Sequence, residues 1–71
     1  MPYASNHELP MAVREHLPGH AQDIFREAFN SAFEQYRESD EPRREQRAFK
    51  VAWAAVKRTY RKDGDRWVAK H

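Results

Sequence analysis

The sequence contains no cysteine among its 71 residues. Disulfide bridges, zinc–thiolate centres and thiol nucleophiles are therefore excluded. Its two glycines stand alone, so there is no glycine-rich loop of the kind that cradles phosphate groups. No apolar run approaches the roughly 20 residues that a membrane-crossing helix needs, and no signal-peptide pattern opens the chain. These absences favour a small cytoplasmic protein that inserts no segment into a membrane.

The sequence is rich in aromatic residues, with two Trp, three Tyr and four Phe. Large hydrophobic residues recur from Ile24 to Val68, which argues against a disordered chain. Ordering a chain of this length costs on the order of 100 kcal/mol, so nearly all of this apolar surface is needed for a core. Few large side chains remain to line a substrate cavity. We therefore expect one domain, residues 1–71, that is not an enzyme and has no cofactor or small-molecule substrate.

Two prolines mark off a short helix near the N-terminus. Pro10 suits the first position of this helix, because its missing N–H costs nothing there. Pro18 ends it, since the residue before a proline is pushed out of the helical region. Beyond Pro18, apolar residues recur at steps of three and four on one side of a helical wheel, with polar residues on the other side. This pattern predicts a long amphipathic helix over residues 19–37.

A second long helix is predicted after a polar loop at residues 37–41. Asp40 suits its N-cap and Pro42 its first turn, and we expect the helix to run to about Lys62. Gly64 lies just beyond this end and can adopt the positive φ that often follows a helix. The apolar sides of the two long helices are predicted to face each other. Their core residues are Ile24, Phe25, Phe29, Phe33, Tyr36, Phe49, Trp53, Val56 and Tyr60.

Both ends of the chain are short and rich in residues that favour strands. We expect residues 2–4 and 66–68 to pair as a two-stranded sheet that joins the termini and packs Tyr3 and Trp67 against the helices. The predicted fold is therefore mainly α, with one short helix, two long amphipathic helices and a small two-stranded sheet.

Several motifs are familiar as a set. They are Met1-Pro2-Tyr3, Leu9-Pro10, Leu17-Pro18-x-His20-Ala21-Gln22-Asp23-Ile24, Glu27-Ala28-Phe29-Asn30-Ser31-Ala32, and Lys50-Val51-Ala52-Trp53-x-Ala55-Val56-Lys57. Together they resemble the ChaB family of cation-transport regulators, from the first residue to about Trp67. The resemblance implies three helices with a small sheet, and association with a calcium/proton or sodium/proton antiporter. Some relatives resemble DNA-binding proteins. The segment 37–47 looks shorter and less acidic than in the bacterial regulators of this family, which argues against a cation-sensing role for it.

Positive charge gathers in the second half of the sequence. Residues 1–36 hold 2 basic and 5 acidic groups, whereas residues 37–71 hold 11 basic and 6 acidic groups. On the second long helix, basic residues follow one line of the wheel opposite the core. The simpler interpretation is a solvated face whose lysine and arginine stems cover the rim of the core. The functional interpretation is a surface that attracts phosphate groups or an acidic protein. The candidate residues are Arg43, Arg44, Arg47, Lys50, Lys57 and Arg61.

No motif predicts a metal site or catalytic residues. Asp63-Gly64-Asp65 is typical of a turn and lacks the alternating acids of a calcium loop. His16 and His20 have a spacing that suits zinc only on a continuous helix, and the proline between them breaks that geometry. The serine and threonine hydroxyls stand in no recognisable acid–base arrangement.

Two functional hypotheses remain. The first is a non-enzymatic regulatory module that binds a protein partner through its exposed polar faces; by resemblance, that partner is a cation antiporter. The second is a small nucleic-acid-binding protein that uses the basic stripe of the last helix. The salt dependence of DNA binding separates them, because phosphate-driven binding weakens steeply as salt rises.

Overall fold

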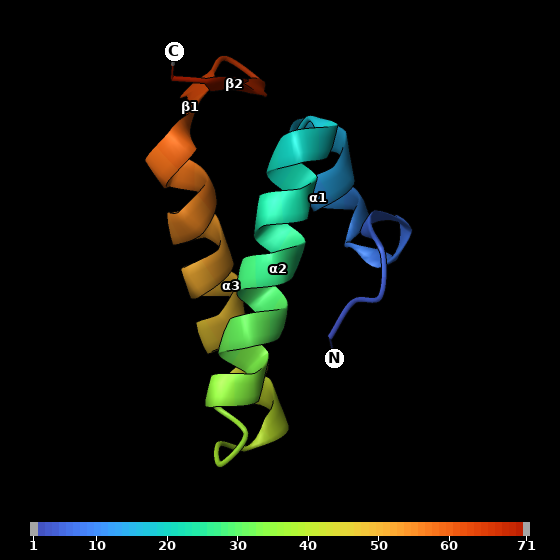
Figure 1. Ribbon diagram of the computed structural model, residues 1–71, viewed down its shortest axis with the longest axis vertical. Helices are drawn as coiled ribbons and strands as arrows, with labels where there is room; N and C mark the ends of the chain where they lie inside the picture. Colours follow the sequence, from blue (N-terminus) through green and yellow to red (C-terminus); the bar gives the residue numbers. More distant parts are fainter. Residues whose placement is uncertain (1, 71) are drawn as a thin grey trace.

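The computed structural model describes residues 2–70 and contains three α-helices followed by a β-hairpin (Figure 1). Met1 and His71, the ends of the predicted domain, lie outside the described residues. The molecule is elongated, with extents of 37 × 22 × 16 Å. The mainly helical prediction with a small sheet is confirmed. The elements are a 3₁₀ turn at Asn6–Glu8, α1 at Met11–His16, α2 at Gly19–Gln35, α3 at Glu41–Thr59, β1 at Tyr60–Asp63 and β2 at Arg66–Ala69.

The two long helices form the body of the molecule. They run side by side, with α1 and the N-terminal segment packed along them and the hairpin beyond the end of α3 (Figure 1). Ala48 and Ala52 on α3 are fully buried. Because their side chains are short, α3 can approach α2 closely. None of the helices in residues 2–70 has the length and hydrophobicity that a membrane-spanning segment requires.

A row of phenylalanine rings along α2 fills the space between the helices. Phe25, Phe29 and Phe33 are spaced one turn apart, with ring centroids 6.4 Å and 5.7 Å from one to the next. From α3, Phe49 meets Phe29 edge-on at 5.0 Å, and Trp53 meets Phe25 edge-on at 5.2 Å. Edge-to-face pairs are favoured by the ring quadrupoles, so these contacts add specificity to the burial of apolar area.

The predicted core residues divide into two groups by burial. Phe25, Phe29, Phe33, Val56 and Tyr60 are buried, whereas Ile24, Tyr36, Phe49 and Trp53 are half-buried and pack against them.

Three buried residues nearer the N-terminus, Leu9, Val13 and Leu17, were absent from the predicted core. Their spacing of four residues was visible in the sequence, and it places all three on one side of the short first helix and its flanks.

The second long helix ends earlier than the sequence predicted. It stops at Thr59 rather than near Lys62, and Tyr60 begins β1. The hairpin register pairs Tyr60 with Ala69 and Asp63 with Arg66, leaving a two-residue turn. Gly64 has φ of +66° and is the first residue of this turn, so its positive φ serves the hairpin and not a helix end. Tyr60 before this turn and Trp67 and Val68 after it favour strands, and the pairing of the two segments across the turn ends α3.

The sheet does not join the termini, so this part of the prediction is wrong. Residues 2–4 form no strand, and the backbone of Tyr3 instead meets the side chain of Asn30 on α2. Asn30 Oδ1 accepts from Tyr3 N–H at 2.8 Å and Asn30 Nδ2 donates to Tyr3 C=O at 2.8 Å. A hairpin closes a loop of two residues, whereas pairing the two ends would close nearly the whole chain at a larger entropic cost. Tyr3 and Trp67 nonetheless pack on helix rings, at 4.8 Å from Phe29 and 5.6 Å from Trp53.

Candidate functional site

The outer side of α3 carries a line of basic residues. Arg43, Arg47, Lys50 and Lys57 are exposed, and we call them the basic face. They lie on the side of the helix opposite buried Ala52, and α2 covers only the inner side of α3 (Figure 1). At 1.5 Å per residue, the face extends about 21 Å along the helix axis.

Acidic residues are absent from the sequence around the last three members of this face, whereas Glu45 lies between Arg43 and Arg47. Residues 46–62 contain six basic residues and no acidic one. Within residues 2–70, the only ion pair that involves the basic face joins Arg43 to Asp40 at 3.9 Å, and both side chains are exposed. Such a pair is screened by water and salt, so it neutralises little of the positive potential. The surface is therefore available to an anionic partner.

Arg47 is held by an aromatic contact. Its guanidinium carbon lies 5.3 Å from the centroid of the Tyr36 ring at the end of α2. A cation over an aromatic face is attracted by the ring quadrupole. This contact leaves the guanidinium N–H groups exposed while it restrains the side chain across the junction of the two helices.

Arg44 does not belong to the exposed surface predicted from the sequence. It is half-buried, its Nε donates to the carbonyl oxygen of Phe33 at 2.6 Å, and its guanidinium carbon lies 3.8 Å from the centre of the Phe33 ring. Phe33 lies in the last turn of α2, where carbonyl groups lack helical partners. Arg44 therefore caps α2 from the neighbouring helix, and its donors face inward.

Arg61 is exposed but does not lie on the helix, which is a second correction. It belongs to β1 and pairs with Val68 of β2. Because side chains alternate along a strand, Arg61 points to the opposite face of the hairpin from Tyr60 and Lys62. A helical wheel places Arg61 in line with the basic face only if α3 continues to about Lys62, as the sequence predicts, whereas α3 ends at Thr59.

Two further exposed basic residues were omitted from the predicted surface. Arg58 lies in the last turn of α3 and Lys62 lies in β1. Both fall inside the acid-free run 46–62, which is a signal that the sequence already contained.

The histidines and acidic residues form no metal centre in the part of the chain that the structure describes. His16 ends α1, and its Nδ1 donates to the backbone carbonyl of Asp65 at 3.1 Å, which ties α1 to the hairpin turn. His20 lies in the first turn of α2, with its ring 6.2 Å from that of Tyr60.

The fold and the basic face define a small helical protein that presents a charged helix surface. The family model described as ChaB matches residues 9–70. The chain is 52% identical to the protein named "Putative cation transport regulator ChaB" of Escherichia coli strain K12, with 99% of each chain covered, and the protein of that name from Shigella flexneri matches equally well. A solved structure titled "NMR solution structure of the putative cation transport regulator ChaB" superimposes with a TM-score of 0.87 at 49% identity, covering 99% of this chain and 100% of the other. The chain therefore belongs to the ChaB family.

The alignment with the Escherichia coli relative extends over 75 positions, so it contains gaps opposite the 71 residues of this chain. The relatives are named as regulators, and their names mention no catalysed reaction.

Proposed function

We propose that this protein is a non-enzymatic regulatory module that binds a protein partner in the control of cation transport. It acts in the cytoplasm, and the partner is a calcium/proton or sodium/proton antiporter or a protein that controls one. The basic face of α3 provides the contact with acidic segments of that partner. The names of the full-length relatives support the regulatory role.

The observation that carries the proposal is the division of α3 into two sides. Its inner side is committed to the core through Ala48, Ala52 and Val56, which are all fully buried. Its outer side carries exposed cations on a helix held by the core, so their spacing is set before any partner binds. A preorganised charged surface loses little conformational entropy on binding and steers an oppositely charged partner toward itself.

Antiport in everted membrane vesicles tests this proposal. Vesicles are prepared from source cells that lack this protein, and sodium/proton and calcium/proton exchange is measured before and after the purified protein is added. We expect the rate of one exchange to change with the unmodified protein. The variant Arg47→Glu with Lys50→Glu should lose most of this effect, because it reverses the charge at the centre of the basic face.

The matched control reverses two exposed charges away from that face, Arg37→Glu with Lys70→Glu, and should behave like the unmodified protein. If the unmodified protein leaves both exchange rates unchanged at every concentration tested, the proposed role in cation transport is wrong.

Nucleic-acid binding is the second candidate function, and the acid-free run 46–62 is the observation that favours it. Phosphate contacts release counterions, so duplex DNA should bind at low salt and its affinity should fall steeply as salt rises. With the four cations of the basic face engaged, the slope of log affinity against log salt should be about −3 to −4. Arg47→Glu with Lys50→Glu should flatten this slope. Absence of a gel shift at low ionic strength would remove the nucleic-acid hypothesis.

A further inference from the structure

At the Lys57 end of the basic face, a hollow of about 300 Å³ lies where α1, α3 and the hairpin meet. Its lining comes from all three elements and consists of Ala12, His16, Trp53, Lys57, Lys62 and Trp67. We call it the tryptophan hollow. It is open to solvent, and its volume is at the lower end of the range for ligand sites in proteins.

Two tryptophan–lysine pairs converge on this hollow. Trp53 and Lys57 are four residues apart on α3, a spacing that places side chains on the same side of a helix. Trp67 and Lys62 are partners in the hairpin register, so their side chains are neighbours on one face of the sheet. The two indole rings meet at 5.6 Å with an angle of 35° between their planes. The lining of the hollow therefore combines an aromatic surface with two lysine side chains, one from α3 and one from β1.

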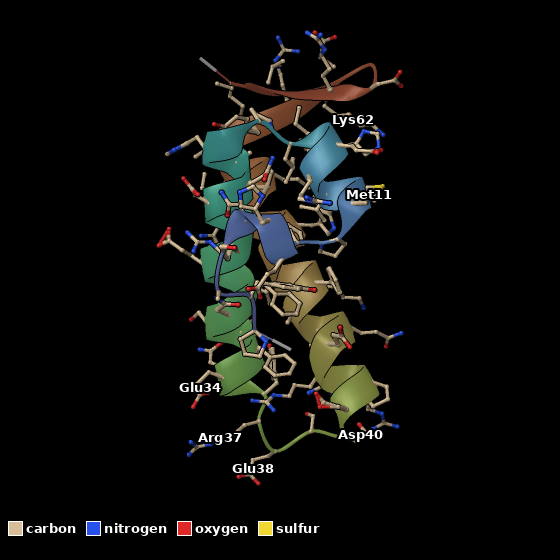
Figure 2. All side chains as sticks on the ribbon, turned by 90° about the vertical axis from the view of Figure 1, so that its right-hand side faces the viewer. Met11, Glu34, Arg37, Glu38, Asp40 and Lys62 are labelled. Carbon is tan, nitrogen blue, oxygen red and sulfur yellow. The ribbon has the colours of Figure 1, made fainter. Side chains whose placement is uncertain are left out.

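The third wall is α1, which is held in place by the hydrogen bond from His16 to the hairpin turn. Ala12 leaves room because its side chain is small. Met11 precedes it and, within residues 2–70, is the most exposed large hydrophobic residue, at 62%. Figure 2 shows Met11 along the same edge of the molecule as Lys62. A flexible, exposed methionine beside an aromatic hollow extends the apolar surface that a partner would meet.

The charged residues that line the hollow are both lysines. No acidic residue lines it, and within residues 2–70 neither Lys57 nor Lys62 takes part in an ion pair. An apolar surface bordered by two unpaired ammonium groups is complementary to a ligand that combines an apolar group with carboxylates.

We infer that the tryptophan hollow binds an acidic peptide segment of the partner protein, with one bulky apolar side chain of that segment packed on Trp53 and Trp67. Carboxylates next to that side chain pair with Lys57 and Lys62. Because the hollow is small and open, it suits a single side chain carried on a backbone that continues outside it. This inference rests on the proposed function as a protein-binding module.

The surroundings favour a short acidic segment over a strand of nucleic acid. Across His16 and Trp67 lies a second hollow of similar size, whose lining includes Glu15 and the oppositely charged Arg66. Asp63 and Asp65 lie on either side of Gly64 in the hairpin turn. A row of phosphates that continued past the hairpin turn would meet these two carboxylates, whereas the few acidic side chains of a short peptide end before reaching them.

Both tryptophans of the chain line the hollow. Trp67 also borders the second hollow but Trp53 does not, so a ligand in the tryptophan hollow is reported by a shift of both indole signals. The probe is the peptide acetyl-Glu-Asp-Leu-Phe-Asp-Glu-amide, titrated while intrinsic fluorescence and the two indole N–H signals of the NMR spectrum are recorded. Its control is acetyl-Gln-Asn-Leu-Phe-Asn-Gln-amide, which has nearly the same shape without charge. We expect the acidic peptide to shift both indole signals and the neutral peptide to bind about fivefold more weakly, as the loss of two exposed ion pairs implies.

Two charge-reversal variants distinguish the effect of local ion pairs on peptide affinity from the effect of the protein's net charge. Lys57→Glu with Lys62→Glu should weaken binding of the acidic peptide about tenfold or more, because attraction is replaced by repulsion. Arg37→Glu with Lys70→Glu makes the same change in net charge elsewhere and should change affinity less than about threefold at physiological salt. All four positions are exposed, and backbone NMR spectra of the free variants verify that the fold is retained.

Equal binding of the neutral and acidic peptides, or equal weakening by both double variants, would overturn the inference. So would a single-stranded oligothymidylate that shifts the same indole signals at lower concentration than the acidic peptide, because the hollow would then be a nucleic-acid site. The vesicle experiment reports on the proposed function independently. If Lys57→Glu with Lys62→Glu regulates antiport like the unmodified protein, the hollow is not the partner's site although the function stands.

Discussion

Arg44 shows that the position of a charged residue on a helical wheel does not decide its role. The wheel places it at the border between the inner and outer sides of α3. The carbonyl of Phe33 at the end of α2 accepts a hydrogen bond from Arg44 Nε, and the ring of the same residue supplies an aromatic face, so the guanidinium lies inward. Arginine suits this position because a planar guanidinium can stack and donate at the same time.

Replacing Arg44 should therefore destabilise the fold, although the residue is charged. Arg44→Ala removes a charge-assisted hydrogen bond and a cation–π contact, and we expect a loss of about 1–3 kcal/mol in the free energy of unfolding by urea. Arg44→Lys should recover only part of the loss, because lysine has no planar group to stack on Phe33. The neighbouring exposed variant Arg43→Ala should change stability by less than about 0.5 kcal/mol. Equal stability of the two alanine variants would contradict the role of Arg44 as a cap.

Tyr3 is the residue whose ionisation the fold disturbs. Burial of its hydroxyl raises its pKa above the ordinary value of 10.0, and the negative charge of Glu45 raises that pKa further. The folded chain thus holds the phenolic proton more tightly than the unfolded chain does. The resulting stability is fully present below about pH 10 and is lost as pH rises through the pKa of the folded state.

Absorbance titration of the tyrosines should show one phenol that ionises later than in a denatured sample. This delayed step should disappear in Tyr3→Phe, which keeps the ring contact with Phe29. In Glu45→Gln the step should move to lower pH, because a repelling charge is removed. A titration curve of Tyr3→Phe that still contains the delayed step would show that another tyrosine is responsible.

At the scale of elements, the hairpin is the part that sequence reasoning placed incorrectly. The sequence predicts a strand at 66–68 and places its partner at the N-terminus, whereas in the structure the partner is 60–63. Gly64 was read as the end of a helix because glycine with positive φ is typical of both helix ends and tight turns. Among the residues that the structure describes, Gly64 alone has positive φ.

Gly64→Ala should weaken the hairpin selectively. Space for a methyl group is available, so the cost comes from the backbone conformation, at about 1–2 kcal/mol for a residue with φ of +66°. Hydrogen exchange should speed up for the amides of 60–63 and 66–69 more than for those of α2. Gly19→Ala is the matched control, since Gly19 has open space around it, lies in the first turn of α2 and is not among the residues with positive φ. Similar exchange rates in both variants would show that the turn conformation does not limit hairpin stability.

At the scale of the whole molecule, stability depends on one aromatic cluster shared by the N-terminal segment and both long helices. Phe29 is fully buried and its ring meets those of Tyr3, Phe25, Phe33 and Phe49. A domain of this size has a net stability of only several kcal/mol, so a single cavity at this point has global consequences.

Phe29→Ala should cost about 3–5 kcal/mol and unfold much of the protein at room temperature, as measured by circular dichroism and thermal melting. Met11→Ala, at an exposed position, should leave the melting temperature almost unchanged. Phe29→Leu retains most of the apolar volume and should be intermediate. A Phe29→Ala variant that melts like the parent would mean that the core lies elsewhere.

The two long helices, the side that each buries and the line of Arg43, Arg47, Lys50 and Lys57 were determined by the sequence alone. Each follows from the helical repeat of 3.6 residues, which is a local property of the chain. The break at Pro18 is equally local, because it arises from steric restriction of the preceding residue.

Only the tertiary structure decided where α3 ends, which strand pairs with residues 66–69, and whether a given arginine faces solvent or a carbonyl group. It also decided the existence of the tryptophan hollow, since Trp53, Trp67 and His16 belong to three different elements. These features depend on which groups become neighbours once the helices pack. Local propensity does not specify such neighbours, because competing pairings differ mainly in loop entropy and in the burial of shared side chains.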